Sequence, residues 1–136
     1  MPNDALTWII SERGSELEPC RPVPSGARVI AQGPSETPAS LAARVRLEVA
    51  GAARVETLVV AAGDRTDSEV LSSRLIMLRA ATSKMLGAGG GRVHLRARAR
   101  HARHAMAALA EVVSEQVRHT SVVVSAGGDT EWPDAA

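Results

Sequence analysis

Apolar residues occur along this chain either in short continuous runs or in longer stripes with helical spacing. The strongest run is VETLVVAA at 55–62, which predicts a strand covered on both faces. Shorter runs at 6–11, 28–32 and 121–125 predict three further strands. Apolar and basic residues alternate without a break over 92–100, which predicts one more strand.

Three helices are predicted between these strands. The first has Thr37 as its N-cap and Pro38 at its first position, followed by an apolar stripe. The second begins where Thr66 and Glu69 have the spacing of a capping box, and GAGGG at 87–91 ends it. Its expected buried stripe is Leu71, Leu75, Leu78 and Met85. The third covers about 101–119 and is expected to bury Met106, Leu109, Val113 and Val117.

The order of elements is therefore β-β-α-β-α-β-α-β, which predicts a single α/β domain. We expect three layers, with a mixed, mostly parallel sheet of four or five strands in which the opening pair is the candidate for an antiparallel arrangement. The domain is assigned to residues 1–126, in which 12–27 form an irregular loop rich in proline and glycine. Residues 127–136 form a polar C-terminal tail.

Composition narrows the class of protein. The chain has 136 residues, a formal charge of +1 and only two aromatic residues, Trp8 and Trp132. Neutral charge and scarce aromatic rings disfavour nucleic acid as a partner. The single cysteine, Cys20, fits a reducing compartment. With no secretory pattern or membrane-length apolar run, we expect a cytoplasmic protein, and its small aliphatic core favours a homo-oligomer.

The 63–69 loop lies where the strongest strand passes into a helix, the edge at which α/β sheets meet ligands and partners. Ser68 is a candidate for phosphorylation, since a helix N-terminus favours an added phosphate. Asp64, Arg65, Thr66 and Asp67 are the candidate partner-binding residues. The alternative is purely structural: Thr66 caps the helix, Glu69 completes the capping box and Asp67 complements the helix dipole.

The predicted basic strand at 92–100, rich in arginine, suggests an alternative function. Arg92, Arg96, Arg98 and Arg100 fall on one face and could bind phosphates or an acidic partner. The structural alternative is that this is an edge strand, protected from aggregation by a solvated, charged face.

The remaining candidate residues do not indicate a phosphate-binding, metal-binding or catalytic site. The glycines at 87–91 follow a helix rather than precede one, so they predict a turn instead of a phosphate loop. His101 and His104 have zinc-ligand spacing, with His94 as a third candidate, but no cysteine or nearby acid completes a set. Cys20 lacks the surroundings of a reactive thiol. We therefore predict no catalytic residue, metal or cofactor, and a protein that is not an enzyme.

The arrangement resembles the STAS domain of bacterial anti-sigma factor antagonists. The matching stretch is LVVAAGDRTDSEVLSSRLIMLRAATSKMLGAGGGRVHL, in which Asp67 and Ser68 fall on the family's Asp-Ser pair and Glu69-Val70 replace the usual Ser-Gly. The resemblance implies a non-catalytic switch phosphorylated at Ser68, with an anti-sigma kinase-like protein as partner. We thus expect a regulatory protein-interaction module; the alternatives are the anion-binding module and a structural or accessory subunit.

Overall fold

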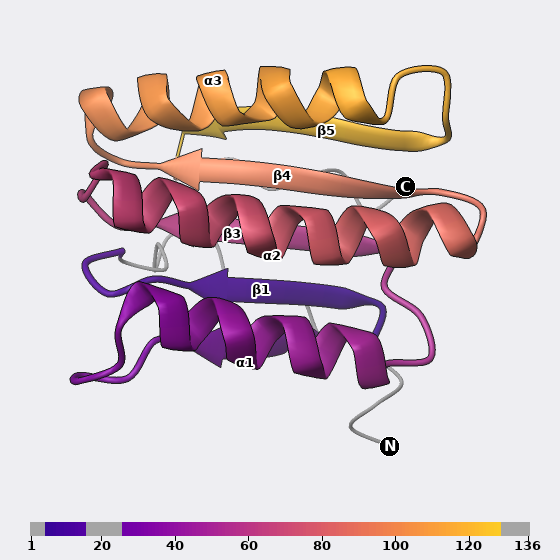
Figure 1. Ribbon diagram of the computed structural model, residues 1–136, viewed down its shortest axis with the longest axis horizontal. Coiled ribbons are helices and arrows are strands. Elements are labelled where there is room, and N and C mark those ends of the chain that lie inside the picture. The colour runs from indigo at the N-terminus through magenta and orange to yellow at the C-terminus, as the bar shows by residue number, and fades with distance from the viewer. Residues whose placement is uncertain (1–4, 16–25, 129–136) are drawn as a thin grey trace.

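The computed structural model describes residues 5–15 and 26–128, which form one five-stranded sheet and three helices. The predicted order of elements is confirmed (Figure 1). The strands are β1 (Thr7–Ser11), β2 (Arg28–Ala31), β3 (Thr57–Ala62), β4 (Gly91–Ala97) and β5 (Val122–Gly128). The helices are α1 (Pro38–Gly51), α2 (Ser68–Gly87) and α3 (Arg100–Gln116).

The sheet has the order β2-β1-β3-β4-β5, and every neighbouring pair is parallel. The expectation of a mixed sheet is therefore wrong at the opening pair. Ile10 of β1 is in register with Ile30 of β2 on one side and with Val60 of β3 on the other. A parallel neighbour requires a crossover of about a dozen residues or more, and the 12–27 segment is long enough to supply it.

All three helices lie on the same face of the sheet (Figure 1). The connections from β2 to β3, β3 to β4 and β4 to β5 all step across the sheet in one direction, so right-handed crossovers place their helices on one side. The described part of the chain thus has two layers rather than the three expected.

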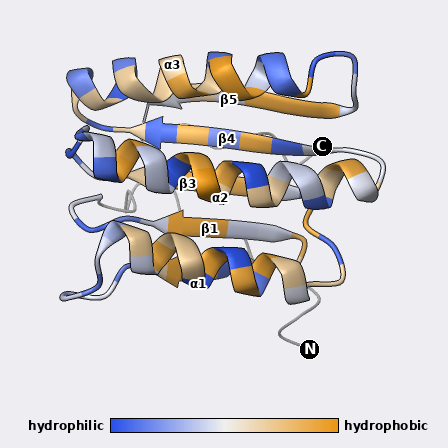
Figure 2. Ribbon diagram, viewed as in Figure 1, coloured by the Kyte–Doolittle hydropathy of each residue, from blue (hydrophilic) through white to orange (hydrophobic). Residues whose placement is uncertain are grey.

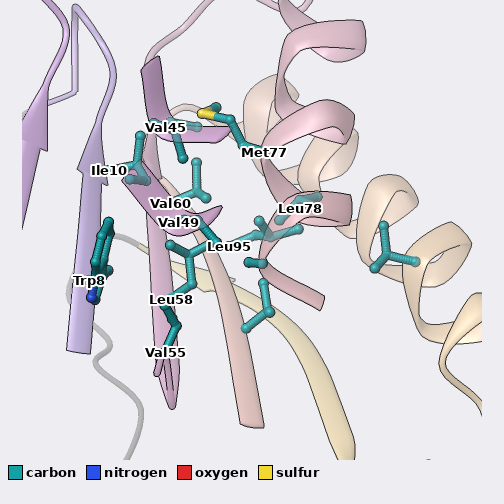
Figure 3. Close-up of a cluster of buried hydrophobic side chains, with 14 of the residues drawn as sticks. Trp8, Ile10, Val45, Val49, Val55, Leu58, Val60, Met77, Leu78 and Leu95 are labelled. Carbon is teal, nitrogen blue, oxygen red and sulfur yellow. The ribbon is translucent and has the colours of Figure 1, made fainter. Parts of the chain in front are cut away.

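The core lies between the sheet and this helical layer. Figure 3 shows Ile10, Val60 and Leu95 of the strands facing Val45 of α1 and Met77 of α2. The side chains are almost entirely aliphatic, as the composition predicts. Trp8 is the exception: the residue is 2% exposed, and its Nε1 donates a hydrogen bond to the carbonyl of Ala5 at 3.0 Å.

Several element boundaries differ from the prediction. The N-cap of α1 is confirmed, since Thr37 accepts a hydrogen bond from the amide of Ser40 at 3.1 Å. Strand β4 ends at Ala97, so the predicted strand over 92–100 was too long, and β5 extends to Gly128, beyond the predicted end of the domain at 126. No helix in the described part of the chain is long and apolar enough to span a membrane.

The buried face of α2 also differs from the predicted stripe. Leu71 and Leu75 are only half-buried, whereas Ser73, Arg74 and Met77 are buried. The buried face of the helix includes Arg74, because this side chain binds Glu12, which directly follows β1. In α3 the expected burial of Met106, Val113 and Val117 is confirmed, and Leu109 is partly buried.

Candidate functional site

The carboxyl ends of β1 and β3 form the topological switch point of the sheet. These two strands are neighbours, but the chain leaves β1 toward β2 on one side and leaves β3 toward β4 on the other. In parallel sheets this divergence opens the crevice in which ligands and partners are usually met. Glu12 directly follows β1, and Gly63 directly follows β3. Figure 2 shows hydrophilic residues at this edge, where α2 begins.

A buried ion pair lies under this edge. Arg74 of α2 donates from Nε to Oε2 of Glu12 and from Nη2 to Oε1, both at 2.7 Å. The Arg74 side chain is 0% exposed and that of Glu12 8%. Glu12 Oε1 also accepts a hydrogen bond from the amide of Gly63 at 3.0 Å. One carboxylate therefore joins β1, the end of β3 and helix α2.

The same arginine fixes the backbone of the 63–69 loop. Arg74 Nη2 donates to the carbonyl oxygens of Arg65 at 2.9 Å and Gly63 at 3.3 Å. From α3, a ring nitrogen of His101 lies 2.8 Å from the carbonyl oxygen of Asp64. The loop is thus held by contacts from two helices and from β1, so its outer side chains are presented on a fixed backbone.

Gly63 allows the loops after β1 and β3 to touch. A Cβ atom at this position would lie 2.2 Å from the carbonyl oxygen of Arg13, closer than any real contact of this kind. The backbone carbonyl of Arg13 therefore occupies the space that any side chain at residue 63 would need. Glycine is required here by close approach of two backbone segments.

The outer surface of the loop is a charged cluster around Arg65. The Arg65 guanidinium donates from Nε and Nη2 to the two carboxylate oxygens of Asp67, both at 2.9 Å, and Nη2 also contacts Glu69 at 3.3 Å. The hydrogen bonds that Arg65 donates to the Asp67 carboxylate lower the pKa of Asp67 and raise the pKa of Arg65. All three side chains are exposed.

Ser68 is exposed and is the first residue of α2. The predicted capping box is wrong: the N-cap is Asp67 rather than Thr66, and it makes no side-chain capping hydrogen bond. Arg65 binds the carboxylates of both Asp67 and Glu69, and Glu69 is the residue that a capping box requires to turn back toward the cap. The Thr66 cap and the Glu69 capping box are therefore wrong, whereas Asp67 does lie at the N-terminus of α2, where its charge complements the helix dipole. Asp64 is exposed beside Arg65 and Asp67, whereas Thr66 is half-buried.

A small cavity of about 70 Å³ lies beside the ion pair, between α1 and α2. Leu41, Val70 and Met77 provide its apolar wall, and Glu12 and Ser73 are among its polar residues. Its volume accommodates a few water molecules or a group of a few heavy atoms. Arg65 also lines it, so the cavity and the charged cluster share one side chain.

The basic strand does not present its arginines on one surface. Strand β4 lies between β3 and β5, so the edge-strand interpretation is wrong. Arg96 is 1% exposed, which excludes a solvated position for it, and Arg92 is half-buried. Arg98 and Arg100 are exposed, but Arg98 follows the strand and Arg100 begins α3.

The histidines do not form a cluster either. A ring nitrogen of His94 lies 2.9 Å from the hydroxyl oxygen of Ser125 in the sheet, whereas His101 contacts the loop at Asp64. Residues 5–15 and 26–128 contain no group of three or more histidine, cysteine or acidic residues that could hold a metal ion. Cys20 lies outside the described residues.

Gly89 and Gly90 have φ values of 95° and 141°, as the predicted turn after α2 requires.

Sequence reasoning missed Glu12 and Arg74, the two residues that organise the site. A signal was present for each. Arg74 falls four residues from both Val70 and Leu78, so it interrupts an otherwise apolar helical face. Glu12 follows an apolar strand directly, at the edge where that strand must end. Opposite charges at two apolar positions predict a buried pair.

Comparison with known proteins assigns no family. No family model matches the chain, and no curated protein matches it significantly.

Proposed function

We propose that this protein is a non-catalytic regulatory module that binds a protein partner through the 64–69 surface and responds to phosphorylation of Ser68. The observation that carries the proposal is the exposure of Ser68 at the start of α2, on a loop whose backbone Arg74 holds from below. The partner that the STAS resemblance implies is a serine kinase of the anti-sigma type.

A phosphate on Ser68 would change this surface through local electrostatics. It would add nearly two negative charges next to Asp67 and Glu69, at a helix N-terminus that favours anions. Arg65 binds both carboxylates, and a phosphate would compete with them for its guanidinium. Phosphorylation would therefore redistribute the Arg65 contacts and make an already acidic surface more negative, without disturbing the buried ion pair.

The proposal is tested by site-specific photocrosslinking in cells, with the crosslinking amino acid placed at residue 68 or at residue 83. Ser83 is the matched control because it is exposed on the same helix but near its opposite end. A protein captured from residue 68 and not from residue 83 is then purified, and its affinity is measured for the wild type, Ser68→Asp and Ser83→Asp.

We expect Ser68→Asp to change the Kd by roughly tenfold or more, which corresponds to the loss or gain of one charge-assisted contact. Ser83→Asp should leave the Kd within about twofold. The proposal is wrong if no protein is captured specifically from residue 68, or if all three proteins bind the captured partner equally. Thermal unfolding of each variant confirms that the fold is intact.

A further inference from the structure

The two edges of the sheet are built differently. Strand β2, at one edge, has four residues, and its Arg28 pairs with Glu48 and lies 5.5 Å from the ring of Trp8. Strand β5, at the other edge, has seven residues with the sequence VVVSAGG. Natural edge strands are usually protected by charge, proline or short length, and β5 has none of these. Among residues 5–15 and 26–128, β5 pairs only with β4, so within this part of the chain its outer edge is open to another strand.

Apolar side chains are exposed along the same border of the molecule. Val112 of α3 is 50% exposed, and Val123 of β5 is 59% exposed on the sheet face away from α3, since Val122 and Val124 face the helical layer. An open groove of about 680 Å³ lies between α3 and β5, with Ala107, Glu111 and Val124 among its lining residues. Figure 1 shows α3 and β5 together at one border of the sheet. In the described part of the chain, this border thus combines a strand edge without a neighbour and exposed apolar surface, as at strand-mediated interfaces.

The charges on α3 indicate which partner fits. Arg100, His104, Glu111 and Glu115 are exposed and separated by four, seven and four residues, so they share one face of the helix. The first two are basic and the last two acidic. In an antiparallel pair of α3 helices related by a two-fold axis near Ala107, Arg100 lies opposite Glu115 of the second copy and His104 opposite Glu111. The alanine at the axis allows the helices to approach closely.

We infer that the α3–β5 border binds a second copy of this chain, with the two β5 strands antiparallel and the two α3 helices side by side. The same two-fold axis serves both elements, because β5 and α3 of each copy are neighbours in the structure. The two five-stranded sheets then become one continuous sheet. Within each copy, Glu115 also forms an ion pair with Arg118, and Glu111 takes no part in this pair.

The inference is tested with two charge variants of the full chain. The first, Glu111→Arg with Glu115→Arg, makes the shared face of α3 entirely basic. The second, Arg100→Glu with His104→Glu, makes it entirely acidic. Both changes agree with the helix dipole, with bases near the C-terminus and acids near the N-terminus, so α3 should remain folded. The mass of each protein is measured by sedimentation equilibrium, alone and in an equimolar mixture.

The wild type should dimerise with a Kd below about 100 μM, and each variant alone should dimerise roughly tenfold or more weakly. The mixture of the two variants should recover a dimer, since each basic face then meets an acidic one. Val123→Lys should weaken the wild-type dimer, whereas Val29→Lys on the opposite edge should not. A monomeric wild type at about 100 μM overturns the inference, as does failure of the mixture to recover the dimer. Dimer loss caused by Val29→Lys and not by Val123→Lys would place the interface on β2 instead.

Discussion

The carboxylate of Glu12 and the guanidinium of Arg74 are 62 residues apart in the sequence and meet through two hydrogen bonds of 2.7 Å inside the sheet edge. Their contact joins the first strand to the second helix at the switch point of the sheet. It also supports the loop that carries Ser68, because Arg74 binds the carbonyl oxygen of Arg65. The stability of the fold and the geometry of the proposed recognition surface therefore depend on the same pair.

Replacing Arg74 with methionine should lower the free energy of unfolding by about 3–5 kcal/mol, because it leaves the Glu12 carboxylate buried without its countercharge. The additional change Glu12→Leu should recover much of this loss, since both charges are then absent. Urea denaturation measures each value. Arg79→Met is the control: Arg79 is exposed on the same helix, and its replacement should cost less than about 0.5 kcal/mol. Equal losses for Arg74→Met and Arg79→Met would contradict the role assigned to the pair.

The sequence predicted the elements well because their signals are local. The Thr37–Pro38 start of α1 and the apolar run at 57–62 each depend on a few neighbouring residues. The direction of β2 and the rotation of α2 depend on contacts between distant segments. The periodicity of a single segment cannot predict such contacts. The stripe on α2 was misplaced for this reason: Arg74 is buried against Glu12, which directly follows β1, while Leu75 lies half-exposed.

The sequence predicted where the candidate site lies in the fold, but it did not predict the contacts that hold the site together. Asp64, Arg65, Asp67 and Ser68 are exposed at the expected edge. The capping box failed because Arg65, which the local pattern left unassigned, binds both acidic side chains. The interpretation of residues 92–100 as an edge strand was wrong because alternation assigns residues to the two faces of a strand but does not show which strand lies at the edge of the sheet. Strand order is a property of the whole sheet, and it makes β4 an interior strand.

Gly63→Ala should destabilise the protein by about 1–3 kcal/mol, since the new methyl group would lie 2.2 Å from the carbonyl oxygen of Arg13 and one backbone segment must move. Gly87→Ala provides the control. Its Cβ would meet nothing within 4 Å, and alanine in a helix is favoured over glycine by up to about 1 kcal/mol. Thermal denaturation distinguishes the two variants. A neutral Gly63→Ala change would show that the β1 and β3 loops are not packed this closely.

Thr37→Ala should lower the free energy of unfolding by about 1 kcal/mol, because the hydroxyl that accepts a hydrogen bond from the Ser40 amide is lost at the start of α1. Ser35→Ala, at an exposed position two residues earlier, should have an effect smaller than about 0.5 kcal/mol. Chemical denaturation of both variants gives the comparison. If the two changes cost the same, the hydroxyl of Thr37 is not a significant cap.

The last prediction concerns pH and the Arg65–Asp67 contact. Hydrogen bonding from Arg65 lowers the pKa of Asp67 in the folded protein, so the stabilising contact is present above the pKa of an unfolded aspartate. It is lost as the pH falls through the lower pKa of the folded state. Arg65→Gln should therefore raise the pKa of Asp67, and the stability difference between this variant and the wild type should shrink in acid. Carbon-13 NMR titration of the Asp67 carboxyl group measures the midpoint in both proteins. Arg79→Gln should leave that midpoint unchanged; an equal midpoint in wild type and Arg65→Gln would show that Arg65 does not hold Asp67 in solution.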